Sequence, residues 1–220
     1  MTKKRITVGT AIILCYVAFV IFMLGVKNHQ AWINGYDQTI YRWIQPLHPN
    51  FDQFFIAFTK IGNPVNMTVL TAIVMLILVI GKHWRLAIFL GLNNGLGSLF
   101  NHFVKHWVLR PRPSHKLIPE TGYSFPSGHA TAAIMFFGSL IVIGFCLVHS
   151  KKQRGLIIGI ALVLIFLLGL SRLVVHVHYP SDVTAGFLLA TANLLVHWLI
   201  AKRTYLKQYY SAQPDLNHAN

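Results

Sequence analysis

The sequence predicts an all-α fold, a polytopic membrane helical bundle with six transmembrane helices and short interfacial helices. Hydrophobic residues make up 55% of the chain and charged residues only 11%, and the mean hydropathy is +0.55. Apolar runs of about 20 residues, the length that spans a bilayer, recur along the chain. The net charge of +14 comes mostly from residues that flank these runs. Membrane topology and anionic headgroups therefore explain it better than nucleic acid does. We expect one integral membrane domain over residues 1–220.

The first apolar run, residues 6–26, follows the basic tripeptide Lys3-Lys4-Arg5. A secretory signal peptide also begins with basic residues followed by an apolar segment. This run is longer than the apolar part of a usual signal peptide and lacks a clear small-x-small cleavage site. We therefore expect it to be retained as the first transmembrane helix.

Residues 27–63 carry aromatic side chains at roughly helical spacing, with charged residues between them. This pattern predicts short amphipathic helices at the membrane surface, where Trp and Tyr sit at headgroup level. Packing against neighbouring helices is an equally good explanation of the aromatic stripe. Pro46 and Pro49 divide the segment into two pieces.

Five further apolar runs complete the expected bundle. The third span is unusually polar and contains Asn93 and Asn94. Polar groups at membrane depth usually face the bundle interior, and we expect these two to form interhelical hydrogen bonds. The expected spans are residues 64–81, 86–104, 128–148, 155–170 and 183–200.

Six spans place both termini on the same side of the membrane. Eleven of the nineteen Lys and Arg residues fall on the side of the termini, so the positive-inside rule makes that side cytoplasmic. The polar segments 105–127 and 171–182 then lie on the opposite side, together with Ser127-Gly128-His129 at the start of the fourth span. Their shared side indicates that they form one site.

Three cations surround this site in the predicted topology: Lys105, Arg112 and Arg172. The sequence Pro126-Ser127-Gly128-His129 begins a helix, and a helix N-terminus favours anions. Arginine pairs bidentately with phosphate oxygens, and lysine supplies a point charge, so the set predicts a phosphate site. The whole chain has five acidic residues, and only Asp182 lies in the motif set, so nothing resembles a carboxylate cluster for a divalent metal. We expect no metal and no other cofactor.

The histidines of these segments differ in their neighbours. Asp182 follows His178 by four residues, which places both on one face of a helix that begins near Tyr179-Pro180. A carboxylate that holds one ring nitrogen leaves the other free as a nucleophile. His129 has no acidic neighbour in its own motif and is the candidate general acid for the leaving oxygen. Other histidines of these segments are assigned structural roles: His106, His115 and His176.

At these positions the sequence resembles the type 2 phosphatidic acid phosphatase superfamily, which shares its core with vanadium haloperoxidases. The matching pieces are Lys105-x6-Arg112-Pro113, Pro126-Ser127-Gly128-His129 and Ser171-Arg172-x5-His178-x3-Asp182, and every signature position is present. The closest resemblance is to the bacterial membrane branch, with phosphatidylglycerophosphate and undecaprenyl pyrophosphate phosphatases. Many relatives carry a small residue where this chain has His176.

The resemblance implies a metal-independent phosphatase that acts through a phosphohistidine. It makes His178 the nucleophile, Asp182 the residue that orients it, and His129 the proton donor. The residues that it implies for the phosphoryl oxygens are Lys105, Arg112, Ser127, Gly128 and Arg172.

The expected function is hydrolysis of the terminal phosphate of a lipid phosphate or pyrophosphate in the cell membrane. Phosphatidylglycerophosphate, phosphatidic acid and undecaprenyl pyrophosphate are the candidate substrates, and no obligate protein partner is implied. A phosphotransferase with the same phosphoenzyme is an alternative, since nothing in the motifs identifies the acceptor. A membrane transporter is a weaker alternative, because the charges gather at helix ends rather than at the membrane midplane.

Overall fold

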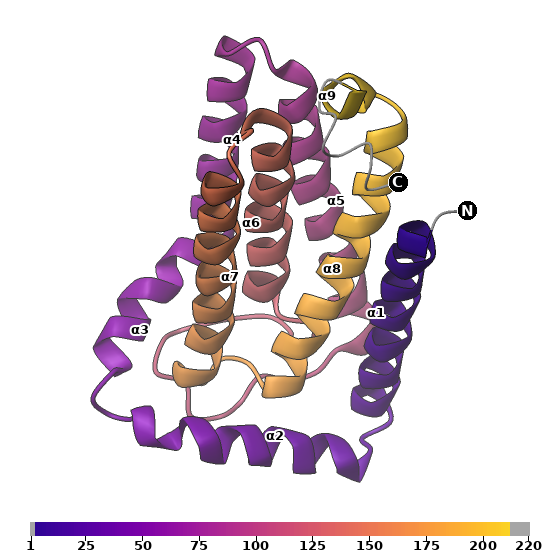
Figure 1. The fold of residues 1–220 in the computed structure, drawn as a ribbon. Helices are drawn as coiled ribbons and strands as arrows, with labels where there is room; N and C mark the ends of the chain where they lie inside the picture. The colour runs from indigo at the N-terminus through magenta and orange to yellow at the C-terminus, as the bar shows by residue number, and fades with distance from the viewer. Residues whose placement is uncertain (1–2, 212–220) are drawn as a thin grey trace.

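The computed structural model describes residues 3–211, and every regular element in this range is a helix (Figure 1). The prediction of an all-α fold is confirmed. Two short 3-10 helices, η1 (Gln45–Leu47) and η2 (Thr59–Gly62), lie on either side of α3. The α-helices are α1 (Lys3–Lys27), α2 (Ala31–Ile44), α3 (Asp52–Phe58), α4 (Pro64–Ile80), α5 (Trp84–Val108), α6 (Gly128–Leu147), α7 (Lys151–Val174), α8 (Pro180–Arg203) and α9 (Lys207–Ser211).

Helix α6 lies at the centre of the bundle and packs against α5, α7 and α8 (Figure 1). Helix α4 packs on α5, and α1 packs on α8. Small residues allow the close approach, as is common between membrane helices. A Cβ atom added to Gly138 of α6 would lie 2.4 Å from the Leu194 side chain, and one added to Gly97 of α5 would lie 2.6 Å from Met135.

Four helices are long and apolar enough to cross a membrane by length and composition: Thr7–Lys27, Gly128–Leu147, Lys151–Val174 and Pro180–Arg203. The pair Asp52–Gly62 and Pro64–Ile80, bent by 53°, would make a fifth. Helix α5 is 25 residues long but does not meet the same test. Asn and His side chains lower its hydropathy. The count of six spans therefore stays a prediction, with α5 as its most polar member.

The polar residues of α5 bond to neighbouring groups in the bundle. The amide of Asn93 donates to the main-chain oxygen of Met135 and to Ser139 Oγ, both on α6. The amide of Asn94 donates to the Leu90 oxygen of its own helix. The expected interhelical hydrogen bonds are thus present for Asn93, whereas those of Asn94 stay within α5.

The helix ends differ from the predicted spans. Helix α7 begins four residues before the predicted span at 155–170 because Ser150 caps it and accepts a hydrogen bond from the Gln153 N–H. It also continues through Ser171 and Arg172. The predicted polar segment 171–182 is therefore the last turn of α7, a short connection and the first turn of α8.

The loop after α5 and the connection from α7 to α8 lie at the same end of the bundle (Figure 1). Helices α5 and α7 stop there, and α6 and α8 begin there. Helix α2 crosses this end, in contact with both α7 and α8. Helix α1 begins, and α8 ends, at the opposite end of the bundle (Figure 1). The three polar pieces of the sequence therefore meet at one end.

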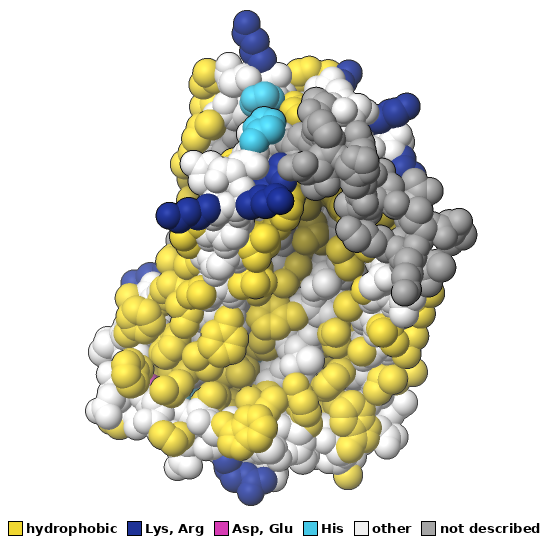
Figure 2. Space-filling view, viewed as in Figure 1, with side chains coloured by type: hydrophobic (Ala, Val, Ile, Leu, Met, Phe, Trp, Pro, Cys, Tyr) yellow, Lys and Arg dark blue, Asp and Glu magenta, His cyan; other side chains and the backbone are white. Residues whose placement is uncertain are grey.

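Hydrophobic side chains cover much of the face drawn in Figure 2. Large apolar residues such as Leu76 and Ile77 on α4 and Phe166 on α7 are exposed. An apolar surface of this extent fits contact with lipid rather than water. Trp43 on α2 and Phe54 on α3 are exposed too, as expected of helices at the membrane surface.

Candidate active site

The start of α6 is held in place by its own cap and by α5. Ser127 is the N-cap residue, and its Oγ accepts a hydrogen bond from the Ala130 N–H at 3.4 Å. The Asn101 amide of α5 donates to the main-chain oxygen of Pro126 and to Thr131 Oγ1. The first N–H groups of a helix have no partner within the helix, so this end offers donors and a positive dipole to an anion.

The starts of α6 and α8 are in direct contact. The Ser127 N–H donates to the main-chain oxygen of Asp182 at 2.9 Å. Gly186 makes this approach possible, because a Cβ atom at that position would lie 2.8 Å from the Ser127 oxygen. The second and third sequence motifs are therefore joined through the backbone.

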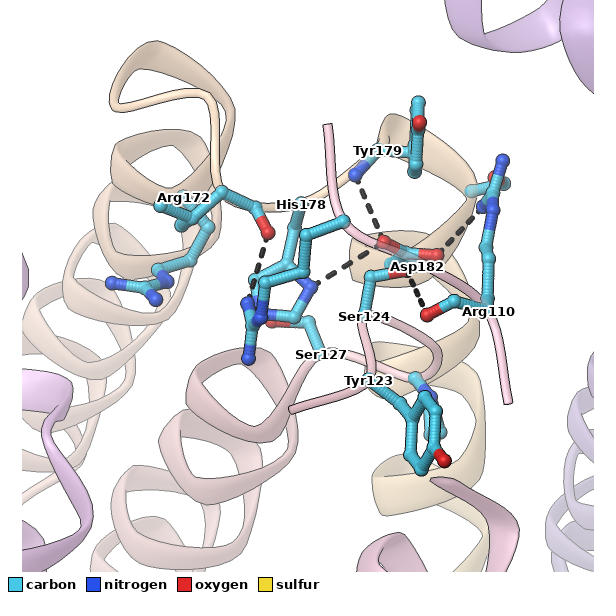
Figure 3. A network of polar contacts seen from close by, with 12 residues as sticks. Arg110, Tyr123, Ser124, Ser127, Arg172, His178, Tyr179 and Asp182 are labelled. Atoms are coloured by element: carbon cyan, nitrogen blue, oxygen red, sulfur yellow. Dashed lines mark hydrogen bonds and ion pairs between the residues drawn. The ribbon is translucent and has the colours of Figure 1, made fainter. Parts of the chain in front are cut away.

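His178 lies in the turn between α7 and α8 and is 1% exposed (Figure 3). Its Nδ1 lies 3.4 Å from Asp182 Oδ2. The same carboxylate oxygen accepts the Tyr179 N–H at 2.9 Å. The main-chain oxygen of His178 accepts the Tyr41 hydroxyl of α2 at 2.7 Å. The contact at Nδ1 thus fixes the ring, and the Tyr41 hydrogen bond fixes the backbone of His178.

The other ring nitrogen of His178 faces a cation. Its Nε2 lies 3.1 Å from Arg112 Nη1. A guanidinium can only donate, so Nε2 accepts, and the ring proton is assigned to Nδ1, beside Asp182. Burial lowers the pKa of His178 well below 6.5, and the positive charges of Lys105, Arg172 and Arg112 lower it further. The imidazole is therefore neutral and carries its lone pair toward the arginine.

Arg112 and Arg172 lie on either side of one carboxylate, Glu120. Arg172 Nη2 lies 2.6 Å from Glu120 Oε2, and Arg112 Nη2 lies 3.6 Å from Oε1. Arg172 is 1% exposed and also donates to Thr59 Oγ1 at 2.7 Å. Its Nε has no hydrogen-bond partner within residues 3–211. The two arginines thus hold one anionic group, and the Arg172 Nε donor remains unpaired.

Lys105 and His129 lie close enough to the two arginines to interact with their charges. Gly128 directly precedes His129 at the start of α6. The Lys105 ammonium at the end of α5 donates to the main-chain oxygens of Tyr123 and Ser124. A Cβ atom at Gly128 would meet only Asn101 Oδ1, at 3.6 Å, so its backbone is open to a close ligand. The His129 ring is buried on α6, where a Cβ atom at Gly62 would come within 2.6 Å of it.

His176, which departs from the common family pattern, packs among aromatic rings. Its ring stacks on Tyr41, with centroids 5.1 Å apart, and lies 5.3 Å from the His48 ring. The residue has a positive φ of 53°. The ring packs on the same Tyr41 that bonds the His178 backbone, and the structural role of His176 stays a prediction.

A comparison with protein families identifies the chain. The model of the PAP2 superfamily matches residues 87–205. This chain belongs to the PAP2 superfamily. The match covers α5 to α8, which carry the Lys105, Ser127, Arg172 and His178 segments.

Known PAP2-like proteins are similar to this chain in sequence and fold. Phosphatidylglycerophosphatase B of Bacillus subtilis is 35% identical over 111 residues, and the bacitracin transport permease protein BcrC of Bacillus licheniformis is 36% identical over 117. These alignments cover 48% and 53% of this chain and 52% of each relative, so the chain spans about half the length of the curated relatives it matches.

A crystal structure matches most of the arrangement of helices. It is the structure of the transmembrane PAP2 type phosphatidylglycerolphosphate phosphatase of Bacillus subtilis, which aligns with a TM-score of 0.78 and 23% identity. The alignment covers 88% of this chain and 96% of that chain. With its several apolar helices, this PAP2 chain is therefore a multi-pass membrane protein with the fold of that phosphatase.

Several residues outside the PAP2 signature also line the site. Glu120 and Thr59 contact the arginines, and Arg110 contacts Asp182. Asp37, one of the charged residues in the expected amphipathic segment 27–63, also lies at the site, 2.8 Å from Arg110. Acidic residues are the signal that sequence reasoning could have used, because three of the four in the described part of the chain gather here: Asp37, Glu120 and Asp182.

Proposed function

We propose that this protein is a membrane phosphatase that removes the terminal phosphate of a lipid phosphate or pyrophosphate through a phosphohistidine on His178. One observation carries the proposal. The buried, neutral ring has Asp182 at Nδ1 and the Arg112 guanidinium 3.1 Å from Nε2. The guanidinium can hold the oxygens of a phosphoryl group, and the neighbouring Nε2 lone pair is then placed to attack its phosphorus.

The first step is in-line attack by the His178 Nε2 lone pair on phosphorus, which breaks the bond to the lipid oxygen. His129 gives a proton to that leaving oxygen, and Asp182 receives the Nδ1–H hydrogen bond of the phosphorylated ring. Water then attacks the phosphohistidine, with its proton passing to His129, and inorganic phosphate leaves. Positioning and charge stabilisation supply most of the catalysis of such a transfer.

The phosphoryl oxygens are assigned to the cations and donors that converge on the site. In this assignment the phosphate takes the position of the Glu120 carboxylate between Arg112 and Arg172. The unpaired Arg172 Nε supports it, because a buried donor without a partner is costly unless a ligand satisfies it. The remaining assigned groups are Lys105, Ser127 and Gly128.

The substrate class is taken from relatives. The sequence match and the structure match from Bacillus subtilis both have names that specify phosphatidylglycerophosphate, which makes this lipid the first candidate. Phosphatidic acid and undecaprenyl pyrophosphate are the others. We further propose six spans including α5, a single domain over residues 1–220, both termini in the cytoplasm and the site on the outer side. The reaction needs no metal, no other cofactor and no protein partner.

The test is release of inorganic phosphate from each of the three lipids in detergent micelles, with EDTA present. We expect the wild type to release phosphate and His178→Ala to release none above background. His115→Ala is the matched control, because that histidine is exposed on the neighbouring loop. Equal release by the wild type and His178→Ala would refute the mechanism, and loss of activity on chelation would refute metal independence.

A labelled phosphate on the substrate separates the alternatives. Hydrolysis gives labelled inorganic phosphate, whereas a phosphotransferase gives a labelled lipid or sugar and little free phosphate. A transporter, the activity in the printed name of the BcrC relative, would move substrate across liposomes without cleaving it. The position of the charges at one bundle end favours chemistry over transport.

A further inference from the structure

Arg110 belongs to a polar cluster beside the proposed nucleophile, and Figure 3 shows it next to Asp182. Its Nη1 donates to Asp182 Oδ1 at 2.6 Å and to Ser181 Oγ at 2.7 Å. Its Nη2 donates to Asp37 Oδ2 at 2.8 Å. The guanidinium carbon lies 3.9 Å from the centre of the Tyr179 ring. One side chain thus connects the loop, α2 and the first turn of α8.

Asp37 completes the cluster from α2. Its Oδ1 accepts the Ser181 N–H at 2.7 Å, and its Oδ2 accepts the Ser181 hydroxyl at 3.0 Å. The side chain is 4% exposed, and Ser181 is fully buried. Ser181 is in the first turn of α8, where a carboxylate is stabilised by free N–H groups and the helix dipole. Asp37 therefore ties α2 to the helix that carries Asp182.

The two oxygens of Asp182 have separate partners. Oδ1 receives Arg110, whereas Oδ2 receives the Tyr179 N–H and faces His178 Nδ1. A fully buried carboxylate without a cation would hold a proton and could not orient an imidazole as an anion. Two aspartates around one arginine give a cluster of net charge −1, which the charge developing on His178 balances.

We propose that Arg110 and Asp37 are positioning residues for Asp182: Arg110 keeps Asp182 ionised, and the two together hold Asp182 aimed at His178. The proposal rests on the phosphatase function above. Neither residue bonds to Arg112 or Arg172, so their contribution acts through Asp182 rather than through the phosphate. The charged and titratable groups that face Asp182 from the surrounding elements are Arg110, Lys105, Arg112, His178, Tyr179, Tyr41 and Asp37.

The test compares Arg110→Met, Arg110→Lys and Asp37→Asn, with Arg42→Met as control because Arg42 is exposed on α2. We expect kcat to fall about 10- to 100-fold in Arg110→Met and Asp37→Asn, with KM within threefold of the wild type. Arg110→Lys retains the charge and restores part of kcat. Circular dichroism and thermal melting of the purified proteins identify any variant that fails to fold.

The pH profile of kcat separates positioning from a purely structural role. Without the Arg110 cation, Asp182 takes up a proton at higher pH, so the acidic limb of Arg110→Met shifts upward and activity recovers as the pH rises. Asp37→Asn removes a negative charge that competes for Arg110, so its acidic limb does not move upward. An upward shift in Arg110→Met without one in Asp37→Asn is expected if Arg110 acts on the charge of Asp182 and Asp37 acts on its position.

Three results would overturn the proposal. The first is kcat within twofold of the wild type in both Arg110→Met and Asp37→Asn. The second is a loss that falls on KM alone. The third is an unshifted pH profile in Arg110→Met together with no rescue by Arg110→Lys. Failure of the phosphatase function itself is distinguishable, because it leaves the wild type without phosphate release or His178→Ala fully active.

Discussion

Two arginines in the loop between α5 and α6, Arg110 and Arg112, are separated by one proline and have opposite surroundings. Arg110 bonds to the carboxylates of Asp37 and Asp182 at 2.8 and 2.6 Å. Arg112 bonds mainly to main-chain oxygens, among them that of Val177, and lies 3.6 Å from the Glu120 carboxylate. Their side chains are similarly enclosed, 12% and 9% exposed.

The difference lies in how much of each charge is neutralised. The two carboxylates raise the pKa of Arg110, although burial acts against them, whereas burial lowers the pKa of Arg112 despite the charges of Glu120 and Asp182. A guanidinium whose charge is not fully balanced favours an anionic ligand. Arg112 is therefore available to bind a phosphate, whereas the charge of Arg110 is used in bonds to carboxylates of the protein.

Removal of the Arg112 cation is expected to have the largest effect, because this arginine and not Arg110 is assigned to the phosphate. We expect Arg112→Met to lower kcat/KM by about 10²- to 10³-fold, the usual loss when a group that stabilises developing charge is removed. The loss falls on kcat and also on KM, because the side chain is assigned to the phosphate of the bound substrate as well as of the transition state. Steady-state kinetics on the best lipid substrate measure it, with Arg42→Met as control. A KM equal to that of the wild type would place Arg112 with Arg110 as a supporting residue.

Thr59 tests whether Arg172 belongs with Arg112. Thr59 is 2% exposed and accepts hydrogen bonds from Arg172 Nη1 and Ser171 Oγ. The isosteric change Thr59→Val leaves a buried donor of Arg172 unpaired, which costs about 1–3 kcal/mol of stability. Thermal melting measures the loss, and addition of inorganic phosphate reduces it if Arg172 turns to the ligand. Thr68→Val, on the exposed face of α4, is the control.

The cations around His178 predict a pH dependence of stability. The pKa of the folded-state ring lies well below 6.5, so the unfolded chain takes up this proton first as the pH falls. Stability from the neutral ring is therefore present above pH 6.5 and is lost by about 1.4 kcal/mol per pH unit below it. Melting curves between pH 7.5 and 5 should show a steeper loss for the wild type than for His178→Asn. Parallel curves would contradict the lowered pKa.

The fold class could be predicted because hydrophobic runs are a local signal, and the meeting of the three motifs could be predicted because the expected topology places all three on one side of the membrane. Apolar runs identify helices, and motif spacing places His178 and Asp182 one turn apart. Contacts made by single side chains across long sequence separations could not be predicted. Asp37 reaches Ser181 from 144 residues away, and no periodic pattern marks it.

The helix ends were the other part that the sequence left open. Hydropathy ends α7 near residue 170, yet the helix continues through Arg172, whose buried Nη1 and Nη2 groups bond to the Thr59 hydroxyl and the Glu120 carboxylate. A charged residue can thus lie inside a helix turn that hydropathy assigns to a loop. Burial of charge depends on partners, and partners become visible only in three dimensions.

Glu120 offers the finest test of the contrast between the two arginines. Its carboxylate bonds to Arg172 and lies near Arg112, so it competes with phosphate for the same cations. The side chain is 28% exposed and its charge is partly screened, so we expect Glu120→Gln to bind inorganic phosphate only about three- to tenfold more tightly. Inhibition of lipid hydrolysis by added phosphate measures this change. Glu120→Asp keeps the charge and serves as the control. Weaker inhibition in Glu120→Gln than in the wild type would mean that the carboxylate organises the arginines for phosphate instead of competing with it.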